Sequence, residues 1–199
     1  MHRFIPRGTL VLTLTLALAL TACGETVNMA PQLRQRLDNP LFAERYWAEL
    51  TDRLVSIQVN DKSLSADEAR RRLVDSLRIE ALKNSQAQTA KRREGLLGRF
   101  VMVSDETDGL ALLLADTLHL SPEFVTYPGP ELRLYLSNAN DPRDVSFPDP
   151  SARDLGLLQS PYGAQSYTAP AAEADAPYRT AVLYDRKLRR MYGFAQLGK

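Results

Sequence analysis

The sequence has few of the residues on which most metal, redox and hydrolytic sites depend. It contains one cysteine, Cys23, and two histidines among 199 residues. A single cysteine excludes an intramolecular disulfide and any CxxC motif. His119 is the only histidine beyond the N-terminal segment, so a histidine-based zinc or haem site lacks partners. We therefore predict no enzymatic activity, no cofactor and no metal.

Three catalytic motifs are also missing from the sequence: a Gly-x-Ser-x-Gly elbow, a glycine-rich phosphate loop and a His-Glu-x-x-His zinc motif. An excess of charge is missing too, because 25 Lys and Arg face 24 Asp and Glu. A chain without a global positive field has no long-range attraction for nucleic acid. We therefore expect no nucleic-acid partner.

Long apolar runs are absent except at the N-terminus, where Thr9–Leu20 follows two arginines. The run is shorter than the ~20 residues that cross a hydrocarbon core, so it predicts an export signal. The residues that follow, Leu-Thr-Ala-Cys ending at Cys23, resemble a bacterial lipobox. That resemblance implies cleavage after residue 22, a diacylglycerol on the Cys23 sulfur and acylation of its amine; a plain secretory signal is the alternative. The lipid would anchor the protein in the membrane.

The residue after Cys23 is glycine rather than the aspartate that resembles an inner-membrane retention signal. In a cell with two membranes we therefore expect the outer membrane. Residues 23–38 are polar without a clear period and predict a tether that lifts the folded body off the membrane.

Glycine is absent between Glu25 and Glu94, which favours a helical arm over residues 39–94. Asn39 and Pro40 can start the first helix, and Ser65 can cap the second, which Gly95 would end. Apolar residues follow in the first helix at spacings of four and three: Phe42, Tyr46, Leu50, Leu54 and Ile57. We expect this stripe to pack on the C-terminal domain.

Trp47 lies beside that stripe and is interpreted as packing material rather than a ligand platform. An alternating Val55, Ile57 and Val59 could instead form a short strand. The clusters Arg70–Arg72 and Lys91–Arg93 either contact anionic lipid headgroups or form a solvated helix face.

Short alternating segments separated by glycine and proline predict a β-rich domain over residues 95–199. The expected strands are Arg99–Ser104, Leu110–Ala115, Glu131–Ser137, Asp154–Gln159, Gln165–Thr168, Arg179–Asp185 and Met191–Leu197. Such a series is typical of an antiparallel sandwich or barrel, so the fold class is α+β, a helical hairpin followed by a β-sandwich. Five tyrosines are expected to pack in its core: Tyr135, Tyr167, Tyr178, Tyr184 and Tyr192.

Two acidic segments could in principle bind calcium: Asp105–Gly109 and the aspartates of Asn138–Pro150. The first lacks the alternating spacing of a calcium loop. Turn and surface-loop chemistry accounts for both segments, so we expect no metal at either.

The segment Gly129–Ser137, GPELRLYLS, resembles the Gly-Pro-Asp-Leu-x-Val-Tyr-Leu-Ser signature of the DM-thirteen domain, a module proposed to take part in electron transfer. Four later blocks in the sequence resemble that family in the same order: Leu155–Leu158, Gly163–Pro170, Val182–Tyr184 and Tyr192–Leu197. The resemblance covers about residues 96–197.

The resemblance also implies a cysteine eight positions before the glycine of the family's Phe-Gly pair. Counting back from Gly193 places Asp185 there. An aspartate offers hard oxygens and no redox cycle, so we expect Asp185 to be an exposed or ion-paired carboxylate. The remaining sulfur ligands would be methionines such as Met102 and Met191.

The sequence thus predicts a lipid-anchored cell-envelope protein whose β-domain is a binding or scaffolding module. Its partner would be an unidentified envelope protein or surface polymer. The alternative is an electron-transfer module of the envelope.

Overall fold

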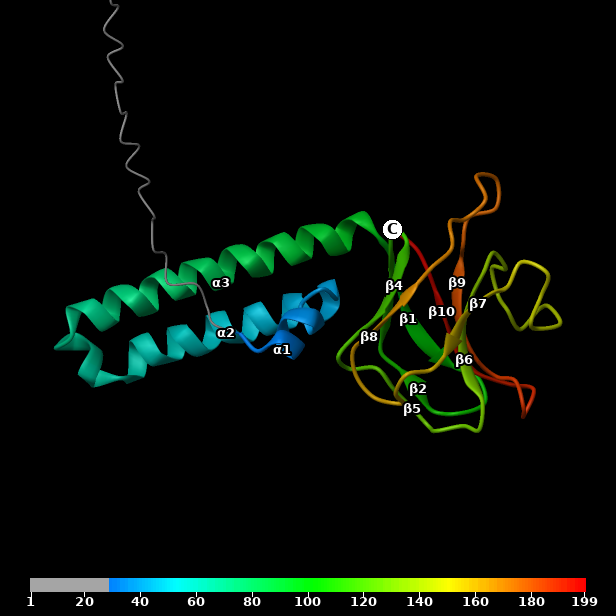
Figure 1. Ribbon diagram of the computed structural model, residues 1–199, viewed down its shortest axis with the longest axis horizontal. Helices are drawn as coiled ribbons and strands as arrows, with labels where there is room; N and C mark the ends of the chain where they lie inside the picture. The colour runs from blue at the N-terminus through cyan, green and yellow to red at the C-terminus, as the bar shows by residue number, and fades with distance from the viewer. Residues whose placement is uncertain (1–28) are drawn as a thin grey trace, which may run out of the picture.

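The computed structural model describes residues 29–199, so the export signal and Cys23 lie outside the described residues. A helical hairpin leads into a curved antiparallel sheet, which confirms the α+β class (Figure 1). The helices are α1 Pro31–Arg36, α2 Pro40–Asn60, the 3-10 turn η1 Lys62–Ser65 and α3 Glu68–Glu94. The strands are β1 Leu96–Met102, β2 Thr107–Asp108, β3 Leu110–Leu114, β4 Thr117–Leu120, β5 Val125–Thr126, β6 Leu132–Ser137, β7 Arg153–Leu157, β8 Gln165–Thr168, β9 Thr180–Asp185 and β10 Arg190–Gln196.

The segment expected to be a tether is partly structured. Helix α1 occupies Pro31–Arg36, with the proline in the first turn, where its missing N–H costs nothing. Met29, two residues earlier, packs against the apolar core of the hairpin together with Leu37. Residues 31–36 of the predicted tether are therefore helical rather than extended.

Helix α2 begins where the sequence predicts. The side chain of Asn39 accepts hydrogen bonds from the amides of Leu41 and Phe42, and Pro40 follows as the first helical residue. The alternative strand at Val55–Val59 is wrong, because both valines lie in the helix and are exposed.

Trp47 is 7% exposed and lies inside the hairpin core rather than beside it, which confirms its packing role. Its ring meets that of Tyr46 edge-on, with centroids 5.1 Å apart. The core contains Ala43, Trp47, Leu54, Leu64, Val74 and Ala81.

The predicted cap of the second helix is wrong. Residues 62–65 form the turn η1, so α3 begins at Glu68 and Asp67 is its N-cap. The Asp67 side chain accepts a hydrogen bond of 3.0 Å from the amide of Arg70. Asp61 caps η1 in the same way through the amide of Ser63, and this extra turn moves the helix start by two residues.

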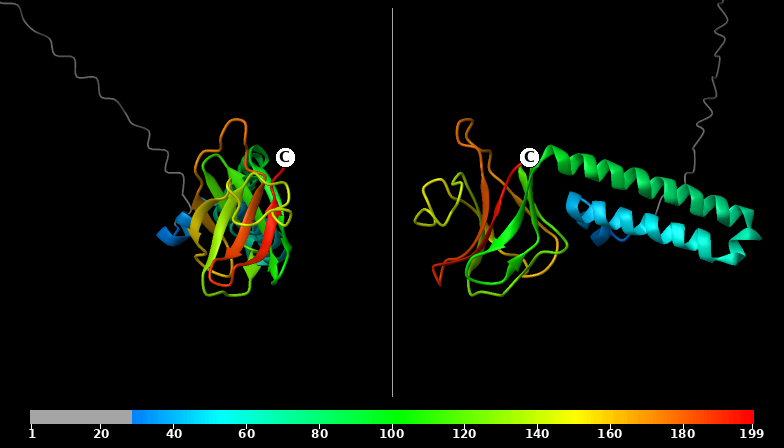
Figure 2. Two further views of the ribbon diagram at one scale, coloured as in Figure 1. Left: turned by 90° about the vertical axis from the view of Figure 1, so that its right-hand side faces the viewer. Right: turned by 180° about the vertical axis from the view of Figure 1, so that it is seen from behind.

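The expectation that the arm packs its apolar stripe on the β-domain is also wrong. Helix α3 covers most of that stripe instead, because Tyr46, Leu50, Leu54 and Ile57 pack in the same core as Val74, Leu77 and Ala81. The hairpin projects from the sheet (Figure 2). Contact with the β-domain is made at the base of the hairpin. There, Arg45 pairs with Glu123 at 2.9 Å, and Lys199 donates to the carbonyl of Glu94 at 2.6 Å.

Asn39 forms the buried part of this junction. Its amide nitrogen donates to the carbonyl oxygens of Leu120 at 2.8 Å and Gln165 at 3.1 Å, while its oxygen caps α2. The residue is 4% exposed. One side chain therefore joins the start of the hairpin to the end of β4 and the start of β8.

The sheet has eight strands in the order β7-β6-β9-β10-β1-β3-β4-β8, and its two edges curve toward each other. After β7, the amide of Gln159 donates to the Tyr167 hydroxyl at 2.9 Å, and its side chain donates to the Ser166 carbonyl at 3.0 Å. These contacts link the edges into a nearly closed sandwich. The sequence missed β4, which follows β3 after only two residues and a turn with a positive φ at Ala115, because no glycine or proline marks that turn.

Apolar residues pack on both faces of the central strands. The inner core includes Phe100, Leu118, Leu120, Phe124, Leu134 and Leu183. On the outer face, Tyr135, Tyr184 and Phe194 pack together, and Phe147 from the loop after β6 covers them. The Asn138–Pro150 segment is thus more than a surface turn, because it buries one face of β6 and β9.

The junction residue yields a prediction. Asn39→Asp keeps the oxygen that caps α2 but turns a carboxylate toward two carbonyl oxygens, so we expect the free energy of unfolding to fall by about 2–4 kcal/mol. Urea denaturation followed by Trp47 fluorescence measures this change. Asn60→Asp is the matched control, because Asn60 is exposed and bonds only within its own helix. Equal losses from both variants would contradict the role of Asn39.

Candidate functional site

Asp185, at the position where the family resemblance places a cysteine, is completely buried. Its Oδ2 atom accepts from the amide of Glu131 at 3.0 Å, and its Oδ1 atom accepts from the amide of Leu188 at 2.8 Å. The prediction of an exposed or ion-paired carboxylate is therefore wrong. Because Asp185 ends β9, its carboxylate faces two turns whose amides need acceptors.

The approach of the Pro-Gly-Pro turn to Asp185 explains why residue 129 is glycine. A Cβ atom on Gly129 would lie 2.6 Å from Oδ2 of Asp185 and 2.8 Å from the hydroxyl of Tyr192. No side chain fits there without movement. The nearby guanidinium groups of Arg133 and Arg186 both pair with the Glu131 carboxylate, at 3.9 Å, and neither pairs with Asp185.

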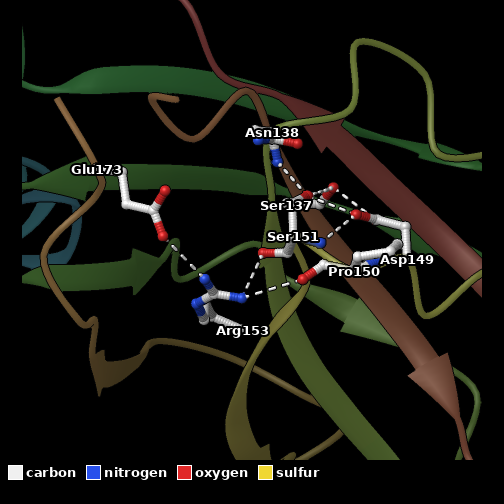
Figure 3. A network of polar contacts seen from close by, with 7 residues as sticks. All are labelled: Ser137, Asn138, Asp149, Pro150, Ser151, Arg153 and Glu173. Carbon is white, nitrogen blue, oxygen red and sulfur yellow. Dashed lines mark hydrogen bonds and ion pairs between the residues drawn. The ribbon is translucent and has the colours of Figure 1, made fainter. Parts of the chain in front are cut away.

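A polar cleft lies elsewhere on the β-domain, next to the loop after β6. We call it the Arg153 cleft; its volume is about 300 Å³, and it is lined by Asn138, Pro150, Ser151, Arg153, Ala171, Glu173, Ala176 and Tyr178. Figure 3 shows Arg153 reaching toward Glu173 on one side and toward the backbone of Pro150 and Ser151 on the other. All three contacts of the guanidinium measure 3.3 Å.

Asp149 holds together the two segments next to the cleft, at Ser137 and Ser151. It accepts from the hydroxyls of Ser137 and Ser151, and the Ser151 hydroxyl accepts from the amide of Asn138 (Figure 3). Burial alone would raise the pKa of Asp149, but the hydrogen bonds from Ser151 and Ser137 outweigh it and hold that pKa below its usual value. The carboxylate therefore stays ionised and keeps the loop fixed.

Two groups on the cleft wall are free to meet a ligand. The side-chain amide of Asn138 and the hydroxyl of Tyr178 have no hydrogen-bond partner within residues 29–199. Together with Arg153 and Glu173, they place donors and acceptors around one small space. The sequence could not predict this cluster, because its members come from three segments that only the folded loops bring together.

The other candidate residues are accounted for by packing. All five tyrosines are buried, which confirms their core role. On the outer face, the rings of Tyr135, Phe147 and Tyr184 have centroids 5.2 to 6.3 Å apart. Met102 is 62% exposed, whereas Met191 packs partly buried against this aromatic group.

The two basic clusters of the arm are partly neutralised. Arg70 pairs with Asp61, Arg72 with Glu68, and Arg92 with Glu44. Within the described chain, Arg71, Lys91 and Arg93 are exposed without an acidic partner. Neither acidic segment considered for calcium brings three possible metal ligands together, as judged over residues 29–199.

His119 is buried and shares a 2.8 Å hydrogen bond between its Nδ1 atom and the hydroxyl of Ser166. Burial lowers its pKa to about 4. The neutral ring is therefore part of the β4–β8 contact.

The chain is thus an α+β protein with a nearly closed antiparallel domain, a buried carboxylate at the end of β9 and a polar cleft on its surface. Residues 99–197 match the family model described as Electron transfer DM13, so the β-domain is a DM13 domain. Searches of curated proteins and of solved structures found no match. Among residues 29–199, no helix combines the length and apolar character that crossing a membrane requires.

The buried histidine yields a pH-dependent prediction. The folded-state pKa of His119 is about 4 and the unfolded value about 6.5, so its contribution to stability is complete above pH 6.5 and is lost as pH falls toward 4. At pH 4.5 this loss is about 2–3 kcal/mol relative to pH 7. We expect His119→Gln, which cannot titrate, to show a correspondingly smaller loss between these pH values in urea denaturation. The same pH dependence in both proteins would exclude this role.

Proposed function

We propose that this protein is a non-enzymatic, lipid-anchored cell-envelope protein whose DM13 domain binds a small polar ligand in the Arg153 cleft. The observation that carries the proposal is the set of polar groups converging there, two of which lack a partner in the described chain. A volume of about 300 Å³ is at the lower end of the range for ligand pockets. The cleft therefore suits a ligand of one or two rings rather than a chain of protein.

The ligand chemistry follows from the lining groups. Arg153 supplies only donors, Glu173 only acceptors when ionised, and Asn138 and Tyr178 supply both. Such a mixture favours a ligand rich in hydroxyl or amide groups. The Arg153–Glu173 pair is solvent-exposed at 43% and 70%, so a ligand carboxylate can replace Glu173 at little cost.

Two related sugars test this site. N-acetylglucosamine is neutral, and N-acetylmuramic acid adds a carboxylate on a similar ring. We expect both to bind in isothermal titration, the acid more tightly, and Arg153→Gln to weaken the acid at least tenfold, because a hydrogen bond to a charged group contributes about 1.5–3 kcal/mol. Arg99→Gln is the control, because Arg99 is 63% exposed and does not line the Arg153 cleft.

Asn138→Ala should weaken both sugars to a similar extent, since it removes a neutral partner. The proposal is contradicted if neither sugar binds. It is also contradicted if Arg99→Gln loses as much affinity for the acid as Arg153→Gln does.

The Asp185 site supports a binding role over thiol redox chemistry. Cys23 is the single cysteine of the chain, and the position assigned to the family's cysteine carries a carboxylate committed to two backbone amides. A carboxylate has no accessible oxidation steps of the kind a thiol has.

Electron transfer remains the second candidate, favoured by the description of the family and by the closely spaced rings of Tyr135, Phe147 and Tyr184. A bound chromophore in protein purified from its own envelope would favour it over ligand binding.

Lipid anchoring is supported by the order of charged start, apolar run and Leu-Thr-Ala-Cys before residue 24. We expect Cys23→Ser, which has no thiol to alkylate, to stay uncleaved or to leave the membrane fraction. Intact-mass analysis of the wild-type chain should show a diacylglyceryl and an acyl group on residue 23. An unmodified Cys23 in membrane-purified protein would disprove the anchor.

A further inference from the structure

We infer that the helical hairpin lies along the membrane surface, with arginines of α1 and α2 against anionic lipid headgroups. The inference rests on the proposed lipid at Cys23 and concerns how the anchored protein is oriented. It replaces the picture of a body lifted away from the membrane.

The first reason is the short reach of the chain. Six residue steps separate Cys23 from Met29, and at about 3.5 Å per step they span at most about 20 Å. Met29 packs on the hairpin core, and α1 begins two residues later. A lipid on Cys23 therefore keeps this side of the hairpin within about 20 Å of the headgroups.

The second reason is the character of the side on which the chain enters. The guanidinium of Arg36 lies 5.7 Å from the centre of the Phe42 ring, and Phe42 stacks on Tyr46. The end of α1 therefore lies over Phe42, beside the edge of the face that α2 turns toward α3. Arg53 is seven residues after Tyr46 and lies on the same side of α2 as Tyr46.

Three cations on this side are available for headgroups. Arg34, Arg36 and Arg53 are exposed, and none has an acidic partner within residues 29–199. We call them the entry arginines. None of the residues of α1 is buried, so its arginines stay accessible to headgroups.

The distribution of charge supports the same orientation. Residues 29–94 contain 13 Lys and Arg against 10 Asp and Glu, whereas residues 95–199 contain 10 against 13. An anionic bilayer attracts the first part and repels the second, with each basic residue near the surface contributing about fivefold to association. The hairpin thus faces the lipid, and the DM13 domain is held beside it at the hairpin base.

The single tryptophan, Trp47, reports on this orientation because it lies in the hairpin next to Tyr46. The mature full-length chain is reconstituted in phosphatidylcholine vesicles with or without phosphatidylglycerol, each containing a dansyl lipid. We expect energy transfer from Trp47 to be at least twofold higher with phosphatidylglycerol. The difference should disappear in 1 M salt, where the Debye length is about 3 Å.

Substitution of the entry arginines identifies the face. Arg34→Gln/Arg36→Gln/Arg53→Gln should abolish the increase, and the corresponding lysine variant should retain it. Arg179→Gln/Lys187→Gln/Arg189→Gln removes the same charge from exposed positions of the DM13 domain and should behave as wild type. Equal transfer from the entry variant and wild type, or an equal loss in the control, would overturn the inference.

The same vesicles separate this inference from the lipid anchor. A chain that does not float with neutral vesicles lacks the anchor, and the proposed function fails. A chain that floats with both vesicle types but shows the same low transfer in each is anchored without hairpin docking, and only the inference fails.

Discussion

The side-chain amide of Asn39 is the contact on which the arrangement of the two halves depends. Its oxygen satisfies free amides at the start of α2, and its nitrogen satisfies carbonyls at the ends of β4 and β8. Because these groups are buried, neither water nor a longer side chain can replace the amide without leaving a polar atom unpaired. Asn39 thus holds the start of the hairpin to the domain, and the exposed Arg45–Glu123 pair and the Lys199–Glu94 hydrogen bond are weaker supports at the same junction.

Asp185 has an equivalent role inside the DM13 domain. Its carboxylate joins the turn before β6 to the turn after β9, and Gly129 is small enough to let the two approach. A thiol at this position would be a poorer acceptor for two amides. The aspartate therefore holds the two turns together through two hydrogen bonds to its ionisable carboxyl group.

Local patterns predicted the elements well, and long-range contacts set what they missed. Asn39 and Pro40 predicted the start of α2 correctly, and each of the seven predicted strands has a counterpart in the sheet. The start of α3 was misplaced because Ser65 and Asp67 are both good caps, and the turn η1 decided between them. Asp185 was expected to be exposed or ion-paired because its neighbours in sequence are basic, whereas one of its two amide partners, Glu131, lies more than fifty positions away. The Arg153 cleft depends on loop folding and has no signature in the sequence.

The antiparallel course of the hairpin has a consequence for how its length can vary. Residue pairs cross it in a constant register, as in Glu44 with Thr89 and Gln58 with Asp75. Asn39 and Gly95, where the chain enters and leaves, both lie at the base. Removing or adding two turns, about seven residues, in each helix would preserve the register and leave the base untouched. The length of the hairpin can thus change without altering its junction with the DM13 domain.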